Sequence, residues 1–187
     1  MAKDQPTVKT RAVLKRHVVF VGLMGAGKSA IGKRVASRIG ARFRDSDAEI
    51  EKAAGMRIAD IFAVHGEADF RSGERRVIAR LLSEEPMILA TGGGAFMDDT
   101  TRALMREHAT TVWMRAELDV LVKRCAKRNH RPLLKTGDPR TILAGLIETR
   151  HPVYEQSDIV IDSRDEPHEI AVRGIVDKLR ARGDLGA

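Results

Sequence analysis

Residues 22–29, GLMGAGKS, constrain the fold of this chain more than any other stretch, because they match the phosphate-binding pattern G-x-x-x-x-G-K-[ST] at every fixed position. A β-branched and aromatic run over residues 18–21 suits a buried strand before the motif, and residues 30–39 suit a helix after it. Strand, glycine-rich turn and helix are the context that the motif requires. The sequence therefore predicts that this chain binds a nucleoside triphosphate.

Each part of the motif has a physical role. Its glycines let the backbone close around an anion, so that N–H groups and the positive end of the next helix point at the phosphates. Lys28 would reach the β- and γ-phosphates, and the Ser29 hydroxyl would take one coordination position on Mg²⁺. The residues expected to bind the nucleotide here are Gly25, Ala26, Gly27, Lys28, Ser29 and Ala30.

The length and charge of the chain favour one domain. With 187 residues, 43% of them hydrophobic, the chain can bury a full core. Residues 1–17 contain five Lys/Arg and one Asp, so +4 of the formal net charge of +7 lies there and only +3 in the other 170 residues. We expect a basic, disordered extension over 1–17, a single domain over 18–182 and a C-terminal tail over 183–187.

The composition also argues against several partners and compartments. An aromatic content of 4% leaves little material for stacking bases, which disfavours a nucleic-acid partner. No apolar run approaches the roughly 20 residues that a membrane helix needs, and residues 1–17 lack the apolar core of a secretory signal. The single cysteine, Cys125, cannot form an internal disulfide. We therefore expect a cytoplasmic protein without a membrane partner.

Two aspartates follow a short predicted strand over residues 41–44. Because ligands bind beyond the carboxyl ends of strands in open α/β sheets, Asp45 and Asp47 should lie near the phosphate loop. Asp47 has two interpretations at this point, as the N-cap of the helix that follows it or as a catalytic carboxylate. The strand over 87–90 ends in Thr91, where many P-loop proteins carry an aspartate for Mg²⁺, so Asp45 is the nearest candidate for that role.

Two further segments suggest contact with a ligand. Three consecutive glycines over residues 92–94 are costly to order, so we expect them where a ligand approaches the backbone itself. Residues 127–137 are basic and contain Pro and Gly, which is typical of a mobile lid over a phosphoryl-transfer site. The remaining pattern predicts helices over residues 48–54, 58–65, 67–82, 98–107, 117–127, 139–148 and 167–182, and strands over 110–114 and 159–161.

Five pieces of sequence now stand in order along the chain. They are residues 22–29, Asp45-Ser46-Asp47, Gly66-Glu67 with Phe70-Arg71, Gly92-Gly93-Gly94, and Arg131-Pro132-Leu133-Leu134 with Arg150-x-Pro152-x-Tyr154. Together they resemble the shikimate kinase family, over roughly residues 18–182. The resemblance implies an α/β P-loop NTPase fold of the nucleoside-monophosphate-kinase-like type, a three-layer sandwich with a five-stranded parallel sheet and a lid. It also implies transfer of the ATP γ-phosphate to the 3-hydroxyl of shikimate, in chorismate and aromatic amino-acid biosynthesis.

The resemblance further implies how the acceptor is bound. Asp47 would hold the hydroxyls of shikimate, Arg71 and Arg150 would clamp its carboxylate, and Gly93 would supply a backbone contact. Paired planar guanidiniums suit a bidentate grip on a carboxylate. An ordinary aspartate, with a pKa of about 3.9, is a weak base, so we expect Asp47 to act mainly by orienting the hydroxyl.

The same resemblance assigns the nucleotide and metal contacts. Asp45 would hold Mg²⁺ through water, beside Ser29, and Arg131 in the lid would reach the phosphates. Arg124 and Arg164 would be further nucleotide contacts. The residues expected to carry the catalytic step are Asp47, Lys28 and Arg131. The family also implies a monomer whose partners are shikimate and ATP with Mg²⁺.

Two other classes of function share parts of this pattern. Another small-molecule P-loop kinase, such as a gluconate kinase, has the same phosphate loop and lid but does not need the two-arginine clamp in this sequence order. A nucleic-acid-dependent NTPase would use positive charge, yet most of that charge lies in residues 1–17.

Overall fold

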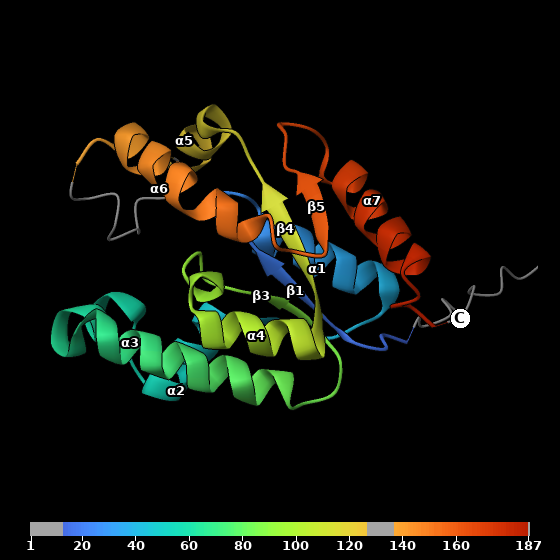
Figure 1. Ribbon diagram of the computed structural model, residues 1–187, viewed down its shortest axis with the longest axis horizontal. Helices are drawn as coiled ribbons and strands as arrows, with labels where there is room; N and C mark the ends of the chain where they lie inside the picture. Colours follow the sequence, from blue (N-terminus) through green and yellow to red (C-terminus); the bar gives the residue numbers. More distant parts are fainter. Residues whose placement is uncertain (1–12, 127–136, 187) are drawn as a thin grey trace, which may run out of the picture.

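A parallel sheet of five strands lies between two layers of helices in the computed structural model, which describes residues 13–126 and 137–186 (Figure 1). The strands are β1 (His17–Val21), β2 (Phe43–Asp45), β3 (Ile88–Ala90), β4 (Ala109–Arg115) and β5 (Ile159–Asp162). Their order across the sheet is β2-β3-β1-β4-β5, and every neighbouring pair is parallel. The expected three-layer α/β fold is confirmed.

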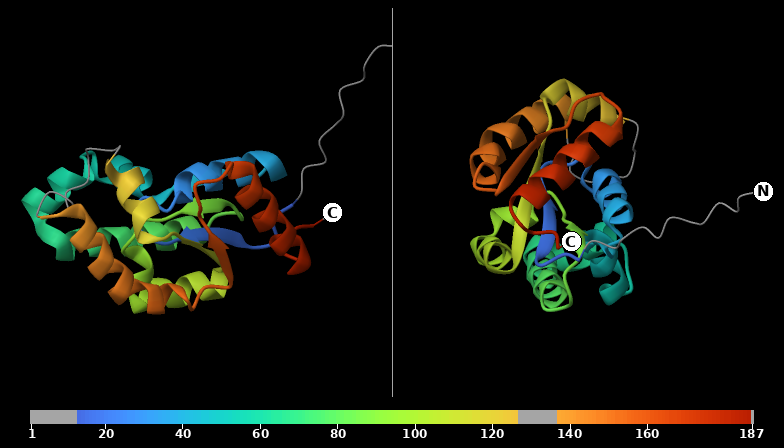
Figure 2. Two further views of the ribbon diagram at one scale, coloured as in Figure 1. Left: turned by 90° about the horizontal axis from the view of Figure 1, so that it is seen from above. Right: turned by 90° about the vertical axis from the view of Figure 1, so that its right-hand side faces the viewer.

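The helices that connect these strands cover both faces of the sheet. They are α1 (Lys28–Ile39), α2 (Ser46–Ala54), α3 (Ile58–Leu82), the 3₁₀ helix η1 (Ala95–Met97), α4 (Asp99–His108), α5 (Leu118–Ala126), α6 (Pro139–Tyr154) and α7 (His168–Ala181). Helices α1 and α7 pack together on one face, and α4 and α6 lie on the other (Figure 2). Parallel strands with helices on both faces are buried on both sides, which is why β1 is apolar almost throughout.

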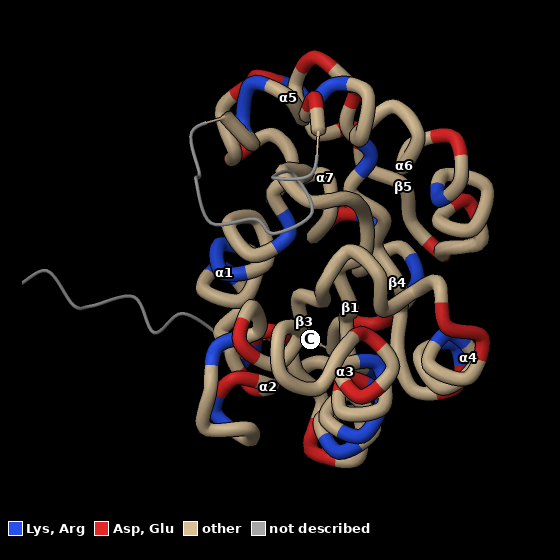
Figure 3. Tube along the Cα trace, turned by 90° about the vertical axis from the view of Figure 1, so that its left-hand side faces the viewer, with Lys and Arg blue, Asp and Glu red and all other residues tan. Residues whose placement is uncertain are grey.

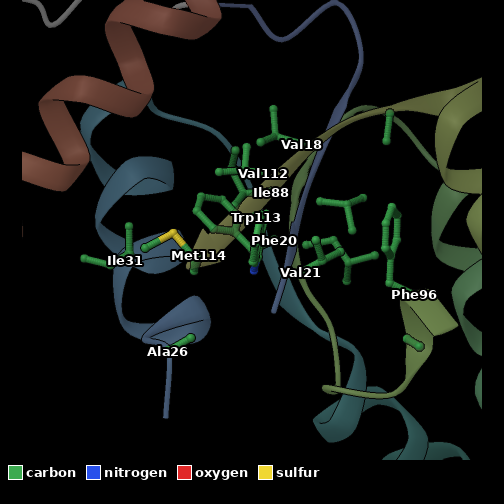
Figure 4. Close-up of a cluster of buried hydrophobic side chains, with 14 of the residues drawn as sticks. Val18, Phe20, Val21, Ala26, Ile31, Ile88, Phe96, Val112, Trp113 and Met114 are labelled. Atoms are coloured by element: carbon green, nitrogen blue, oxygen red, sulfur yellow. The ribbon is translucent and has the colours of Figure 1, made fainter. Parts of the chain in front are cut away.

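The core fills the space between the central strands and these helices. All five residues of β1 are buried, as are the first six of β4. Ile31 of α1 and Met114 of β4 lie on one side of the strands, while Phe96 lies on the far side (Figure 4). The strands that lead into the phosphate loop and the glycine turn are therefore fixed by packing on both faces.

Helix α3 contains a sharp break. The sequence predicts separate helices over residues 58–65 and 67–82, and the structure interrupts α3 at the same place, because Gly66 has φ 80° and ψ 177°. That backbone conformation is open almost only to glycine. The second half of α3 consequently takes its own direction, alongside α4 (Figure 1).

Two expectations about the extent of the fold need correction. Helix α6 does not end near residue 148 but continues through Pro152 to Tyr154. A proline in a helix removes only one backbone hydrogen bond to the preceding turn, and Tyr154 is fully buried, so tertiary packing holds the last turn.

The packed chain also extends beyond residues 18–182 at both ends. His17 belongs to β1, and Leu14 and Leu185 form an antiparallel bridge in which both side chains are buried. Lys15 N–H donates to Asp184 O at 2.9 Å, and Gly186 N–H donates to Val13 O at 2.8 Å. We call residues 13–15 and 184–186 the terminal clasp. Parts of both expected terminal segments are therefore ordered against the domain.

Charged side chains of both signs are interspersed along the helices (Figure 3). Exposed arginines pair with neighbouring carboxylates, as in Arg75 with Asp98 at 3.0 Å and Arg80 with Glu49 at 3.0 Å. The mixture agrees with the small net charge expected outside residues 1–17. Among the described residues, no helix is both long and apolar enough to cross a membrane.

Candidate active site

The phosphate loop connects β1 to α1 and depends on glycine. Gly25 has φ 82°, and a Cβ added there would lie 2.9 Å from the Cys125 sulfur and 3.4 Å from Leu121 O. A larger residue would therefore be strained both by its own backbone and by α5 beneath it. Cys125 packs behind the loop, in agreement with the packing role expected for it.

Lys28 and Ser29, the first residues of α1, lie within the curl of this loop. The Lys28 ammonium donates to Gly22 O at 2.7 Å and to Leu23 O at 3.0 Å. The Ser29 hydroxyl donates to Asp45 Oδ2 at 2.6 Å. The structure thus joins the predicted metal residues, Ser29 and Asp45, although 16 positions separate them in the sequence.

The position of Asp45 decides one of the two interpretations of Asp47, the capping role. The other carboxylate oxygen of Asp45 accepts the Asp47 N–H at 3.1 Å, so Asp45 is the N-cap of α2. The capping role proposed for Asp47 is therefore wrong, and its side chain is available for other contacts. Helix α2 starts at Ser46, two residues earlier than the sequence pattern indicates.

The Asp47 carboxyl lies in an unfavourable place for a charge. Burial, followed by the repulsion of Asp45, raises its pKa from 3.8 to about 6, against the opposing attraction of Lys28. Glu74 adds to the repulsion. Asp47 is thus mostly ionised at neutral pH, but it binds a proton far more readily than an exposed aspartate does.

Glu74 is a second buried carboxyl, which the sequence analysis did not identify. It lies on α3, and its Oε2 accepts a hydrogen bond from Arg71 Nη1 at 2.7 Å. Its side chain is only 3% exposed. Oε1 is buried and has no hydrogen-bond partner within the described chain, and burial raises the Glu74 pKa although Arg71 opposes this. In the sequence, the only indication of this ion pair is that Glu74 follows Arg71 by three residues, a spacing that brings two side chains together on a helix.

The three glycines after β3 connect these groups. A Cβ on Gly92 would lie 2.8 Å from Asp47 Oδ1, and one on Gly94 would lie 2.4 Å from Arg71 Nη1. A Cβ on Gly93 would lie 3.6 Å from Arg150 Nη1 and 3.5 Å from Met24 N in the phosphate loop. Each glycine of the turn therefore faces one predicted substrate-binding residue, beside the phosphate loop.

Hydrogen bonds from two helices, α2 and α6, anchor this turn. The Gly92 N–H donates to the buried Ser46 hydroxyl at 3.2 Å. Gly93 O accepts from Arg150 Nη1 at 3.0 Å and from the Tyr154 hydroxyl at 2.5 Å. Neither Ser46 nor Tyr154 was assigned a role from the sequence, because nothing local indicates which distant carbonyl or N–H each would meet.

Two predicted nucleotide contacts lie on the opposite side of the phosphate loop. Arg124 of α5 donates to Ser163 Oγ at 2.8 Å and to Arg164 O at 2.6 Å, with Gly25 O at 3.4 Å. The Arg164 side chain is 70% exposed and lies near Asp162 and Glu166. Arg131 and most of the predicted lid, residues 127–136, lie outside the described residues. The roles of all three arginines stay predictions.

The described residues contain no cluster of three or more His, Cys, Asp or Glu side chains able to hold a metal ion. Ser29 and Asp45 bring a hydroxyl oxygen and a carboxylate oxygen together at the end of the loop, and both are hard donors. Fold and site together define a P-loop phosphotransferase that pairs a phosphate loop with a carboxylate- and arginine-rich acceptor site.

The chain belongs to the shikimate kinase family. The family model described as shikimate kinase matches residues 24–180. A shikimate kinase of Paramagnetospirillum magneticum is 55% identical over 185 residues, which cover 99% of this chain and 94% of that protein. One from Nitrobacter winogradskyi is 48% identical over 182 residues, or 96% and 85% of the two chains.

A solved structure agrees with this assignment. The shikimate kinase of Acinetobacter baumannii in complex with shikimate superposes with a TM-score of 0.86 at 30% identity, covering 89% of this chain and 94% of that one. The family resemblance inferred from the five motifs is confirmed.

Proposed function

We propose that this site transfers the γ-phosphate of ATP to the 3-hydroxyl of shikimate, with Asp47 at the reacting hydroxyl and Arg71 and Arg150 at the carboxylate. The observation that carries the proposal is the glycine turn over residues 92–94, whose members face these three residues one by one. The family of the chain, and the shikimate bound to the A. baumannii relative, supply the identity of the acceptor.

The two arginines suit the carboxylate of the acceptor. Arg71 is held by Glu74 on one side and by contact with Gly94 on the other, and Arg150 is held by Gly93 O. A guanidinium fixed in this way still has donors left for a carboxylate. The pairing with Glu74 also keeps Arg71 in place before the acceptor arrives.

Asp47 has the proton affinity of a useful base. With a pKa of about 6, its carboxylate is mostly ionised at neutral pH and accepts a hydrogen bond from the acceptor hydroxyl. Phosphoryl transfer through a loose transition state needs positioning and charge neutralisation more than a strong base. Asp47 thus orients the hydroxyl first and takes up its proton as the oxygen bonds to the γ-phosphorus and the bond from that phosphorus to the bridging oxygen of ADP breaks.

Ser29 and Asp45 fit a Mg²⁺ ion that ATP would bring. Their oxygens meet at 2.6 Å, and hydroxyl and carboxylate oxygens are ligands that Mg²⁺ prefers. When bound, the ion neutralises charge on the phosphates.

Lys28 would turn from the loop carbonyls to the β- and γ-phosphates, and Arg131, Arg124 and Arg164 would contact the rest of the nucleotide. The residues of the site come from one chain, so we infer an active monomer.

The first experiment is a coupled assay for ADP release from Mg·ATP, with shikimate, gluconate, AMP or single-stranded DNA offered separately. We expect release with shikimate only. Release with another acceptor, or without any, would show that the acceptor residues have been assigned wrongly while leaving the phosphate loop intact.

Two substitutions test the assigned roles. Asp47→Asn should lower kcat strongly even at saturating shikimate, since the amide oxygen accepts a hydrogen bond from the hydroxyl more weakly than a carboxylate does and cannot take up its proton. Arg71→Lys should raise KM for shikimate about tenfold or more and leave KM for ATP nearly unchanged, because an ammonium cannot replace the planar fork. Arg75→Lys, one turn further along α3 and paired with Asp98, is the matched control and should behave as wild type.

A further inference from the structure

Tyr154 has an unusual position for a tyrosine. It is fully buried at the end of α6, where its ring stacks against Trp113 with centroids 5.9 Å apart and against Phe96 at 6.3 Å. The hydroxyl points away from this cluster and donates to Gly93 O at 2.5 Å. The apolar part of the side chain therefore serves the core, while the polar end reaches the acceptor site.

Two donors from one helix converge on the same carbonyl. Arg150 and Tyr154 are four residues apart, so they lie on one face of α6, and both donate to Gly93 O. Glycine torsions are soft, so a turn of three glycines does not fix its own shape. Outside anchors must do so, and Tyr154 and Ser46 supply them at Gly93 O and Gly92 N.

Planarity of the peptide bond makes this anchor effective. Fixing the Gly93 carbonyl oxygen also fixes the plane that contains the Gly94 N–H, and Gly94 is the residue against which Arg71 packs. The same oxygen holds Arg150. The orientation of one carbonyl thus sets the relative placement of both guanidiniums assigned to the carboxylate.

We propose that the Tyr154 hydroxyl is a positioning group for the acceptor substrate, which holds the Gly93 carbonyl so that Arg71 and Arg150 are placed for the carboxylate before shikimate binds. The inference rests on the proposed function, since it concerns the same site. Burial raises the pKa of Tyr154 to about 12, so the hydroxyl keeps its proton and can donate around neutral pH.

Tyr154→Phe tests the role of the hydroxyl, because phenylalanine keeps the ring in the aromatic cluster. We expect KM for shikimate to rise about three- to tenfold, the range set by losing one hydrogen bond, with KM for ATP unchanged. Thr149→Val is the matched control, since the Thr149 hydroxyl donates to Gly145 O within α6, at 2.9 Å, and faces solvent. It should leave both KM values as in the wild type.

An unchanged KM for shikimate in Tyr154→Phe would overturn the proposal. An equal rise in both KM values would also overturn it, because it would show a general loss of structure. If the wild-type chain itself failed to use shikimate, the proposed function would fall instead, so the two failures are distinguishable.

A second measurement needs no substitution, because Tyr154 is the only tyrosine in the chain. Biosynthetic replacement of tyrosine by 3-fluorotyrosine would give one ¹⁹F resonance. Saturating shikimate should shift this resonance, since the carboxylate would engage the arginine that shares the carbonyl with the ring hydroxyl. A resonance that does not move with shikimate would contradict the proposal.

Discussion

At the scale of single residues, the buried carboxyl of Asp47 should lower the stability of the folded protein at neutral pH. Its pKa is about 6 in the folded protein and 3.8 in an unfolded chain, so the folded state binds this proton more tightly. Between about pH 4 and about pH 6 the unfolded chain has already lost this proton, while the folded protein still holds it. The free energy of unfolding therefore falls as the pH rises through this range. Above about pH 6 this difference in pKa lowers the free energy of unfolding by an amount on the order of 3 kcal/mol.

Asp47→Asn should consequently raise the Tm while lowering the activity. The gain in Tm should be larger at about pH 7.5 than at about pH 5, because the charge that is removed is fully developed only at the higher pH. Thermal unfolding of both proteins at the two pH values measures this difference. An equal gain at both would show that charge burial is not the cause.

The same ionisation should appear in the kinetics. If Asp47 accepts the hydroxyl proton in its carboxylate form, as proposed, kcat/KM for shikimate should rise as the pH increases through about 6 and level off above it. The profile is measured at saturating Mg·ATP, so that titration of the nucleotide does not contribute. A profile that is flat between about pH 5 and pH 8 would count against Asp47 as the group that accepts the proton.

At the scale of elements, the break in α3 is the feature most open to test. Gly66→Ala should destabilise the protein by about 1–3 kcal/mol, because φ 80° with ψ 177° is strained for any residue with a Cβ. An added Cβ would meet nothing within 4 Å, so a steric clash does not contribute.

Gly73→Ala is the matched control for this substitution. Gly73 lies in the regular part of α3 and also has open space around it, so alanine there should stabilise the helix by about 0.5–1 kcal/mol. Circular dichroism melts of the two variants should therefore move in opposite directions. Equal melts would mean that the break at Gly66 is not maintained by its backbone conformation.

The elements also show which features the sequence could predict. The phosphate loop and the break at Gly66 depend on backbone conformations that favour glycine, and the glycine turn after β3 depends on close approaches that a Cβ would block, so a local pattern was sufficient. The end of α6 was mispredicted because Pro152 is a local signal that distant packing overrides. Glu74 and Tyr154 escaped assignment for the same reason, since their partners Arg71 and Gly93 are identified only by the fold.

For the whole molecule, the terminal clasp links the two ends of the domain at the amino ends of the strands, opposite the active site. Leu185→Ala should lower the free energy of unfolding by about 2 kcal/mol through lost burial, and the Tm by several degrees. Val13→Ala, at a side chain that is 64% exposed, should have almost no effect. Neither should change kcat, and a fall in kcat for Leu185→Ala at a temperature where it is folded would contradict this separation.

The clasp has a consequence for the order in which the polypeptide is connected. Because Gly186 N–H donates to Val13 O, a linker of a few residues could join these positions and make the backbone of the domain a closed ring. That ring could be opened in the exposed segment between α3 and β3, over residues 83–86, which also lies at the amino ends of the strands. Such a circular permutant should still phosphorylate shikimate, since the spatial order β2-β3-β1-β4-β5 does not require the chain to begin at β1.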